Sequence, residues 1–413
     1  MDNTLYWLWI QEALGVASRK LPDVLERFGT PEQFYRATPD RRRKSGLFNA
    51  AGLARIEKTD LKTAYAQLKL CAELYIDLLT PDDDSYPDLL KSIADPPAVL
   101  YVWGHLPDMD RELGIAAVGT RHASEYGCAA AYKLCGDLAR AGVVVVSGGA
   151  NGIDSSCLNG ALAQGGRTVC VLGCGINTPY LMGAIDMRRQ VAKNGAVISE
   201  YPPNAPAEPH HFPIRNRLMS ALSRGIVVIE AKRISGALIT ADHATEQNRD
   251  VFAVQGSAFS KNFEGCHNLL REGAIPVSTA ADILTEYLPA FGEILKPDGI
   301  DEPILDAAPP KEKDKPVCRP RKAKTEPIPP KVAPPVPKKR TAPELCEALV
   351  DVGAMSPLAR ELYEAMTADA AHTADYLCDH TGKPCGTVLA ALTELEILGA
   401  VTALPGNQYK KIV

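Results

Sequence analysis

A short segment, Phe212–Arg217, contains two arginines and an asparagine, the residue types that suit phosphate binding. An apolar run follows at Ile226–Ile229, and a stretch of small residues follows at Ser235–Thr240. This order predicts a helix start, then a buried strand, then a turn that opens another helix. In an α/β sheet such an arrangement directs cations and backbone amides toward anions. The sequence therefore predicts a site for a polyanion.

Two further turns follow apolar runs and could contact phosphate. The first, Gly119–Arg121, places an arginine at its rim. The second, Ser147–Asp154, holds three consecutive or nearby glycines that permit a close backbone approach. Each turn alone is compatible with an ordinary loop, but their shared place at the carboxyl ends of strands favours an anion site. Neither matches the GxGxxG or P-loop pattern, which disfavours a P-loop ATPase.

We expect no metal, cofactor or catalytic residue. The eleven cysteines are scattered without a CxxC pair, so we interpret them as reduced core residues and not as zinc ligands. His210 and His211 lie beside Glu208 in the sequence. Adjacent histidines on an extended chain point apart, so we assign them surface or hydrogen-bonding roles. No Ser-His-Asp arrangement can be placed with assurance, because such triads are defined by geometry.

The overall charge excludes a globally basic protein. The 413 residues include 45 Lys and Arg against 50 Asp and Glu, a formal net charge of −5. Any basic surface must therefore be local. The start of the chain lacks a signal-peptide pattern, and no apolar run approaches the length of a membrane span. We expect a soluble, cytoplasmic protein with no membrane partner.

The hydrophobic pattern divides the chain into segments. Residues 1–78 show helical periodicity cut by turn residues and predict a small helical domain. Residues 79–290 alternate short β-branched runs with helix-length segments, which predicts an α/β fold with an extended Rossmann-like, doubly wound, mostly parallel sheet. The expected strands are Val99–Val102, Ile115–Val118, Val143–Val146, Val169–Leu172, Ala196–Ile198, Ile226–Ile229 and Val251–Val254.

The last third of the chain differs in composition. Residues 291–345 are rich in proline, and positions 311–340 hold eleven Lys and Arg against three acidic residues, a net of 11 − 3 = +8. This segment is predicted to be a disordered linker, serving either as a solvated spacer or as a basic arm for nucleic acid. Residues 346–413 predict a winged-helix-like domain. Its recognition-helix position, Thr387–Leu398, contains no Lys or Arg, which favours protein contact over base reading.

These motifs occur together, and in the same order, in one known family. The chain is similar to the DNA-processing protein A (DprA/Smf) family over about residues 80–280, and its ends resemble the SAM-like and winged-helix domains of some members. The resemblance implies a protein of natural transformation that binds and protects single-stranded DNA, passes it to the RecA recombinase and forms a homodimer through its core. The matching segments are Tyr86–Pro87, Pro96–Tyr101, Val118–Arg121, Ser147–Asp154, Ser199–Pro203, Phe212–Arg217, Ser235–Thr240 and Gln255–Gly256.

The resemblance also implies a set of DNA-binding residues. Arg121 and Arg217 are expected to pair with phosphates, and the glycine turns are expected to present backbone amides. Asp154 is expected to cap a helix or orient Arg121, and Arg215 either contacts phosphate or holds an acidic residue such as Glu230. The implied DNA-binding set is Gly119, Arg121, Ser147, Gly148, Gly149, Asn151, Gly152, Asp154, Asn216 and Arg217.

The chain departs from the family pattern at several positions. Cys157-Leu158 stands where members have Ala-His, and Pro179–Ala184 lacks a lysine that many members carry. One cationic contact to DNA is therefore expected to be lost.

The alternative function is enzymatic. Folds of this outline also occur in nucleotide phosphoribohydrolases, which use a Glu near a glycine-rich loop to cleave a nucleoside monophosphate. The PGGxGTxxE signature of that group is absent, and the nearest acidic residues, Asp154 and Glu200, have another context. We favour a non-catalytic DNA-binding protein.

Overall fold

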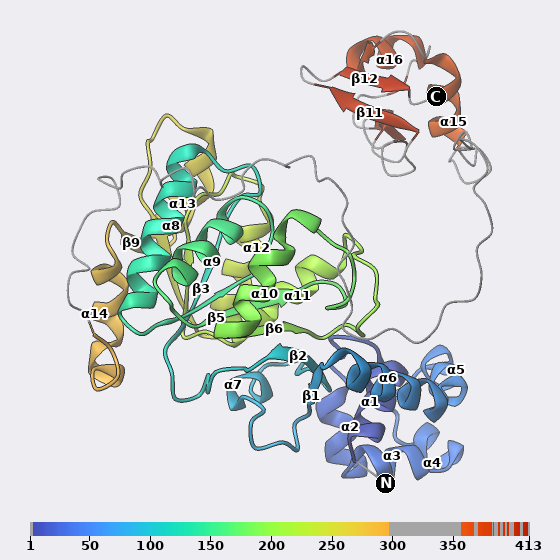
Figure 1. Ribbon diagram of the computed structural model, residues 1–413. Coiled ribbons are helices and arrows are strands. Elements are labelled where there is room, and N and C mark those ends of the chain that lie inside the picture. Colours follow the sequence, from blue (N-terminus) through green and yellow to red (C-terminus); the bar gives the residue numbers. More distant parts are fainter. Residues whose placement is uncertain are drawn as a thin grey trace, which may run out of the picture. The chain divides into compact units, whose positions relative to one another are not determined.

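The computed structural model describes residues 3–296 and, with gaps, residues 357–411. The chain divides into two compact units, residues 1–325 and 326–413, and each is described here by itself (Figure 1). The predicted linker lies almost wholly outside the described residues. None of the described helices combines the length and the apolar character that crossing a membrane requires.

The first unit begins with short helices, as predicted. Proline at the first helical position and a capping threonine side chain start two of them, α3 and α4. Their apolar side chains pack around Trp7, Trp9 and Phe34 and reach Val99 and Tyr101 at the edge of the main sheet. The helices are α1 Asn3–Leu14, α2 Leu21–Phe28, α3 Pro31–Arg36, α4 Pro39–Lys44, α5 Ala50–Lys58 and α6 Leu61–Leu74.

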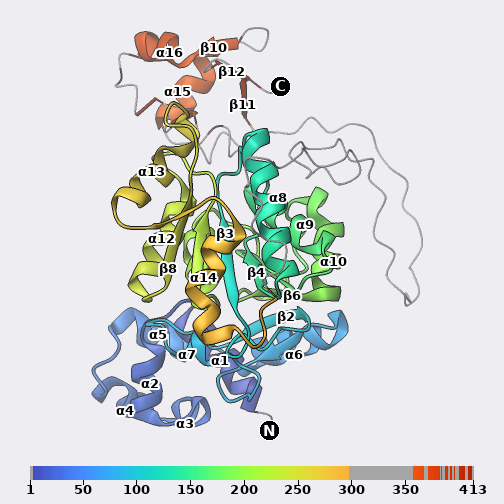
Figure 2. The same ribbon diagram turned by 90° about the vertical axis from the view of Figure 1, so that its left-hand side faces the viewer.

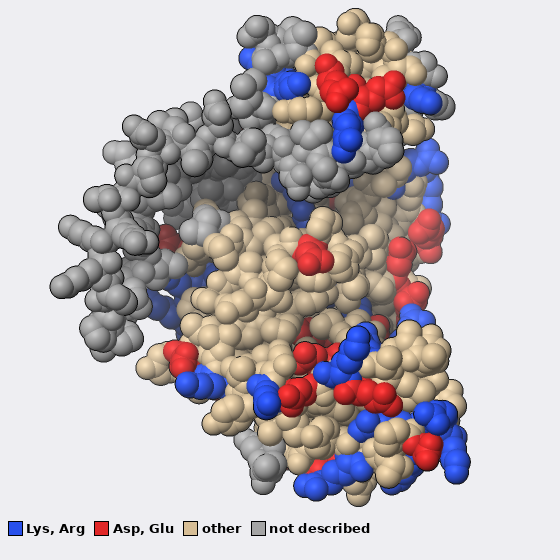
Figure 3. All heavy atoms as spheres, turned by 90° about the vertical axis from the view of Figure 1, so that its right-hand side faces the viewer, with Lys and Arg blue, Asp and Glu red and all other residues tan. Residues whose placement is uncertain are grey.

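Charged side chains of both signs mix on the part of the surface formed by these helices, at the bottom of Figure 3. Several of them form exposed ion pairs within one helix, such as Arg36 with Glu32 at 2.9 Å and Arg43 with Asp40 at 3.2 Å. Such pairs contribute little to stability. This face therefore offers no broad positive surface of a single sign.

A nine-stranded sheet forms the centre of the unit, in the order β1-β2-β6-β5-β4-β3-β7-β8-β9. The strands β6, β5, β4, β3, β7, β8 and β9 pair in parallel with their neighbours in this order. Strands β1 and β2 are antiparallel additions at one edge. The doubly wound, mostly parallel sheet predicted from the apolar runs is confirmed. The strands are β1 Asp77–Leu79, β2 Leu100–Gly104, β3 Gly114–Val118, β4 Val144–Ser147, β5 Thr168–Leu172, β6 Gly195–Ser199, β7 Gly225–Val228, β8 Asp250–Val254 and β9 Ile275–Val277.

Helices cover both faces of this sheet (Figure 2). Alternate residues of β3 enter the two cores: Ile115 and Ala117 pack toward one face, and Ala116 and Val118 pack toward the other. The first face carries α8 Glu125–Arg140, α9 Ile153–Ala163, α10 Ile185–Asn194 and α14 Ala280–Phe291. The second carries α7 Asp88–Lys91, α11 His211–Ala221, α12 Gly236–Glu246 and α13 Glu264–Arg271.

The sheet has one topological switch point. From β3 the chain proceeds through β4 and β5 to β6 on one side, and then crosses to β7 on the other side of β3. The loops that leave the carboxyl ends of β3 and β7 therefore diverge to opposite faces. In open α/β sheets this divergence opens a crevice where ligands bind.

The second unit has a small sheet of order β10-β12-β11 packed on helices, in keeping with the predicted winged helix. Strand β10 was not predicted. The predicted recognition-helix position, Thr387–Leu398, is described only at isolated positions. The described elements are α15 Pro357–Ala365, β10 Ala371–Thr373, α16 Ala374–Thr381, β11 Val401–Leu404 and β12 Gln408–Lys411.

Candidate phosphate-binding site

A pocket of about 430 Å³ lies at the switch point. Its walls come from the loop after β3, the loop after β7 and the first turns of α11 and α12. The volume falls in the range typical of small-ligand sites. Its polar and charged lining residues are Thr120, Arg121, His122, Asp154, Arg215, Asn216, Lys232, Ser235 and Thr240.

Arg121 is the exposed cation at the pocket rim. Its guanidinium lies 5.0 Å from the centre of the Phe212 ring, and it forms no ion pair with any residue in the described part of the chain. Phe212 in turn contacts Tyr180, with ring centres 5.3 Å apart. An aromatic platform thus positions a positive charge that remains available to an anion.

Arg215 is a buried cation, only 4% exposed, that supports the pocket from below. One guanidinium nitrogen donates to the carbonyl oxygens of Gly148, at 2.9 Å, and Val171. Burial lowers the pKa of Arg215 and the nearby Asp154 carboxylate opposes that change, so the guanidinium stays charged. Its positive charge therefore contributes to the field inside the pocket.

The suggested pair between Arg215 and Glu230 does not form. The Glu230 carboxylate accepts hydrogen bonds from the backbone N–H and hydroxyl of Ser124, the latter at 2.7 Å, and from the Asn262 amide at 2.6 Å. Glu230 therefore fastens the start of α8 to the end of β7. It stabilises the two loops that diverge around the pocket.

The glycine turn after β4 supports the pocket from behind. The Ser147 hydroxyl donates to the Ala117 carbonyl at 2.7 Å and is buried. Gly149 and Gly152 have φ of 63° and 83°, where other residues are strained. A Cβ at Gly152 would lie 2.5 Å from the Thr120 carbonyl oxygen, so only glycine lets the two turns approach.

Asp154 links this turn to α9. Its carboxylate is buried and accepts a hydrogen bond from the Ala150 amide at 3.4 Å. Burial raises the pKa of Asp154 to about 6, while Arg215 and the Ala150 amide oppose the rise. A carboxylate that titrates near 6 in a cleft is a candidate for function as well as structure.

Arg217 does not reach the pocket, contrary to the expectation that it pairs with phosphate. It is 3% exposed, and its guanidinium lies 2.5 Å from Glu200 Oε2 and 3.4 Å from Asp95 Oδ2. Burial raises the pKa of Glu200, and Arg217 opposes that change. The pair is a buried structural contact on the opposite side of α11.

The structure thus separates the ten residues expected to bind DNA. Gly119, Arg121, Asp154 and Asn216 line the pocket together. The Ser147, Gly148, Gly149 and Gly152 positions form the supporting turn, whereas Asn151 is exposed outside the lining and Arg217 points away.

Besides Arg215, whose role was left open, five polar or charged lining residues were absent from the expected set: Thr120, His122, Lys232, Ser235 and Thr240. Lys232 is exposed in the loop after β7, and Thr240 has a buried hydroxyl with no hydrogen-bond partner among the described residues. Their signal in the sequence was position, because each lies in the loop after β3 or β7 or in the first two turns of α12.

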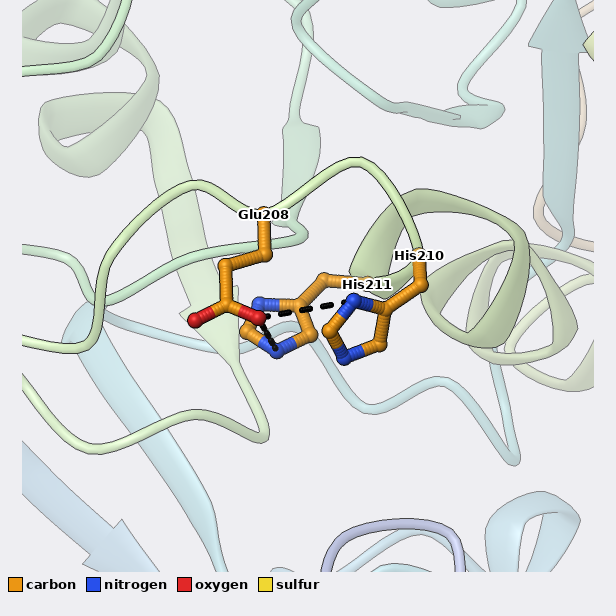
Figure 4. Close-up of side chains that lie close together, drawn as sticks. All are labelled: Glu208, His210 and His211. Atoms are coloured by element: carbon orange, nitrogen blue, oxygen red, sulfur yellow. Dashed lines mark ion pairs between the residues drawn. The ribbon is translucent and has the colours of Figure 1, made fainter. Parts of the chain in front are cut away.

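Glu208, His210 and His211 gather beside the start of α11 (Figure 4). The expectation that the two histidines point apart was wrong. His210 has the helical backbone conformation φ −72°, ψ −15° at the start of the helix, so the chain is not extended there. The ring centres lie 4.4 Å apart.

Comparisons with known proteins give a consistent result. A profile of the family described as DNA recombination-mediator protein A matches residues 77–288, and a profile of the DprA winged helix domain matches residues 336–407. Protein Smf of Synechocystis sp. is 31% identical over 427 residues, which cover 98% of each chain. The DNA processing protein DprA of Streptococcus pneumoniae is 39% identical over 205 residues, which cover 50% of this chain and 72% of that protein.

One solved structure of comparable fold is the X-ray structure of DprA from Streptococcus pneumoniae. It matches with a TM-score of 0.61 and 32% sequence identity, and covers 69% of this chain and 98% of the other.

Proposed function

Because the chain belongs to the DprA/Smf family of DNA-processing proteins, we propose that it binds single-stranded DNA by seating backbone phosphate in the pocket between β3 and β7. The observation that carries the proposal is the charge arrangement there. Arg121 and Lys232 approach the pocket from loops on opposite sides of the switch point, and the buried Arg215 lies beneath it. Cations so placed attract the phosphate groups of a strand without regard to sequence.

The shape of the site favours a single strand over a duplex. The pocket is a concave space of about 430 Å³, and the phosphate and sugar of a flexible strand can enter it. A stiff duplex cannot bend one nucleotide inward without paying for unstacking. Contacts are then mainly to the backbone, as in other sequence-tolerant single-strand binders.

Membership of the family supports a proposal for the wider role. We propose that the protein protects incoming single strands in the cytoplasm during natural transformation, loads RecA on them, and acts as a homodimer without a catalytic step. Among the described residues of the lining, Asp154 is the only carboxylate. Assembly of RecA on strands coated with single-strand-binding protein, with and without this chain, tests the loading role.

Binding itself is tested by fluorescence anisotropy of a labelled single strand and the matching duplex across a salt series. We expect preference for the single strand and an affinity that falls steeply with salt. Arg121→Ala and Lys232→Ala should each weaken binding by about tenfold and reduce the salt slope by about one unit.

Arg233→Ala is the matched control. Arg233 is an exposed arginine next to Lys232 but does not line the pocket. Its loss should leave both affinity and salt slope nearly unchanged. If all three variants weaken binding equally, the strand follows general surface charge and the pocket assignment fails.

One observation favours the enzymatic alternative, a nucleotide phosphoribohydrolase. Asp154 combines a pKa near 6 with a pocket large enough for a nucleoside monophosphate. Release of free base from nucleoside monophosphates, lost in Asp154→Asn, would establish it. No release, together with strand binding that a mononucleotide does not displace, would exclude it.

A further inference from the structure

We propose that Glu208, His210 and His211 form a binding site for one Zn²⁺ ion at the edge of the phosphate pocket (Figure 4). Glu208 Oε2 lies 3.4 Å from His210 Nδ1 and 3.9 Å from His211 Nε2. One ligand atom from each of the three residues can be chosen so that all lie within 4.8 Å of one another.

These separations are close to those of a zinc site. Ligands about 2.0 to 2.1 Å from a tetrahedral Zn²⁺ stand roughly 3.3 Å from one another. The present distances therefore need to contract by only a fraction of an ångström to about 1.5 Å. The Glu208 and His210 side chains are 47% and 66% exposed, so rotation of their side chains can supply that movement.

The backbone holds the three residues in a tight turn. The His211 N–H donates to the Glu208 carbonyl at 3.0 Å, and Pro209 occupies the second position of the turn, where its ring fixes φ. The three ligands thus come from four consecutive residues that are already folded together. Little chain entropy is lost when an ion binds.

His211 is the most firmly positioned ligand. Its side chain is only 13% exposed, and its ring stacks on Tyr201 with centres 4.0 Å apart and planes 26° apart. This packing fixes the orientation of the ring before any ion binds.

The donor set selects the kind of ion. Two imidazole nitrogens and one carboxylate oxygen suit Zn²⁺ and related transition metals, whereas Mg²⁺ and Ca²⁺ prefer oxygen ligands alone. Three protein ligands leave a fourth position open. The described cysteines are mostly buried and none lies in the cluster, so thiolate is not part of this site.

The ion would add positive charge beside the pocket, because Pro209, Phe212 and Pro213 of the same segment line it. Two features weaken the binding of a cation here. The N-terminus of α11 carries partial positive charge, and Glu208 is the only acid in the cluster. We therefore expect an affinity on the order of micromolar, weaker than that of closed structural zinc sites. The proposal concerns ion binding alone and does not depend on the DNA-binding role.

The test uses the full chain, treated with a chelator and titrated with Zn²⁺ alone in an isothermal titration calorimeter. We expect about one ion per chain. X-ray absorption of the zinc-loaded protein should show nitrogen and oxygen neighbours without sulfur. His210→Gln and Glu208→Gln, which change exposed side chains, should each weaken binding by at least about tenfold.

His243→Gln is the matched control. His243 Nδ1 lies 3.6 Å from Glu246 Oε2, an exposed His–Glu pair that lacks a second histidine. This variant should bind zinc as the unchanged protein does. The proposal is overturned if no ion binds at tens of micromolar, if binding survives both Glu208→Gln and His210→Gln, or if sulfur ligands are found. Circular dichroism confirms that each variant is folded.

Discussion

At the scale of single residues, Asp154 links phosphate binding to pH. Its pKa is raised to about 6 by burial, so its negative charge is present at pH 8 and largely lost at pH 5. Removal of a negative charge from the pocket strengthens the attraction of phosphate. We predict that affinity for single-stranded DNA rises by roughly tenfold, about 1.4 kcal/mol, as pH falls from 8 to 5. Anisotropy at constant ionic strength measures it.

The control for this pH effect is Asp154→Asn. Both the parent and the variant carry His122→Asn, so that the other pocket residue that could change charge is removed from the comparison. The variant should bind at pH 8 as tightly as its parent binds at pH 5. Because the folded pKa lies above the usual value of 3.8, the parent also loses stability as pH rises from about 3.8 to about 6. Equal pH dependence in parent and variant would contradict the assignment.

Arg217 should behave in the opposite way to Arg121. Arg217→Met leaves Glu200 buried without its cation, and breaking such a pair typically costs about 3 to 5 kcal/mol. We predict a large fall in the free energy of unfolding with little change in the affinity of the folded protein for DNA. Urea unfolding and anisotropy on the same samples measure the two quantities.

Arg121→Ala should show the reverse pattern, because Arg121 is exposed and holds no ion pair within the described residues. The assignment would be contradicted if Arg217→Met lowered DNA affinity but not the free energy of unfolding. It would also be contradicted if Arg121→Ala lowered the free energy of unfolding but not DNA affinity. Either result would mean that the two arginines have been assigned to the wrong sides of α11.

At the scale of elements, helix α11 explains this division of labour. Phe212, Arg215, Asn216 and Met219 all line the pocket, and their spacing of three, four and seven residues places them on one helical face. Arg217 follows Arg215 by two residues, a rotation of about 200°. Its side chain therefore faces the opposite side, toward Glu200 and Asp95.

The turn after β4 requires glycine at position 152, because the β3 loop approaches it closely. We predict that Gly152→Ala destabilises the protein by more than about 3 kcal/mol and also weakens DNA binding. The added Cβ would meet the carbonyl oxygens of Thr120 and Arg121 at 2.5 and 2.7 Å, which displaces the loop that carries Arg121. Urea unfolding and anisotropy measure both effects.

Gly165→Ala provides the matched comparison. Gly165 also has a positive φ, 68°, but a Cβ there would meet no atom within 4 Å. It should cost only the backbone strain, about 1 to 3 kcal/mol, and leave DNA affinity unchanged. Similar losses of affinity in both variants would show that strain, and not the contact with the β3 loop, governs the site.

The central parallel strands β3 to β7 could be predicted from the sequence because each is buried along its whole length and reads as a continuous apolar run, as at Val143–Val146. The three-residue strands Asp77–Leu79 and Ile275–Val277 could not, since they are too short to show a pattern. The antiparallel direction of β2 was equally hidden. An apolar run carries no information about which way its strand pairs.

The site was predictable in location and only partly in composition. Glycine turns at strand ends identified the pocket edge because parallel strands must present those turns together. Arg217 was misplaced because the motif was read as a continuous segment, although the helical period already separated it from Arg215. The closeness of the His210 and His211 rings could not be predicted, because it depends on the helical backbone conformation of His210 at the start of α11. The expectation that adjacent side chains point apart holds only for an extended chain.

At the scale of the whole molecule, removal of the N-terminal helices and removal of residues 326–413 should have different effects on stability. The N-terminal helices are bound into the core: Gln11 Nε2 donates to the Glu200 carbonyl at 2.5 Å, and the Ala17 N–H donates to its carboxylate at 3.1 Å. Val99 and Tyr101 are buried in the same apolar cluster as Trp7 and Trp9. Deleting residues 3–74 would expose these side chains to water.

We predict that this deletion lowers the thermal midpoint of the core by well over 10 °C or prevents folding, whereas deletion of residues 326–413 leaves the midpoint of the core within a few degrees. The physical reason is that the helices share a hydrophobic core with β2, while residues 326–413 form a compact unit with their own apolar cluster. Differential scanning calorimetry of the full chain and both deletions measures it. An unchanged thermal midpoint after deletion of residues 3–74 would contradict this prediction. It would mean that the hydrogen bonds of Gln11 and Ala17 to Glu200 contribute no net stability. The Arg217–Glu200 ion pair would then have to remain formed when it is exposed to water.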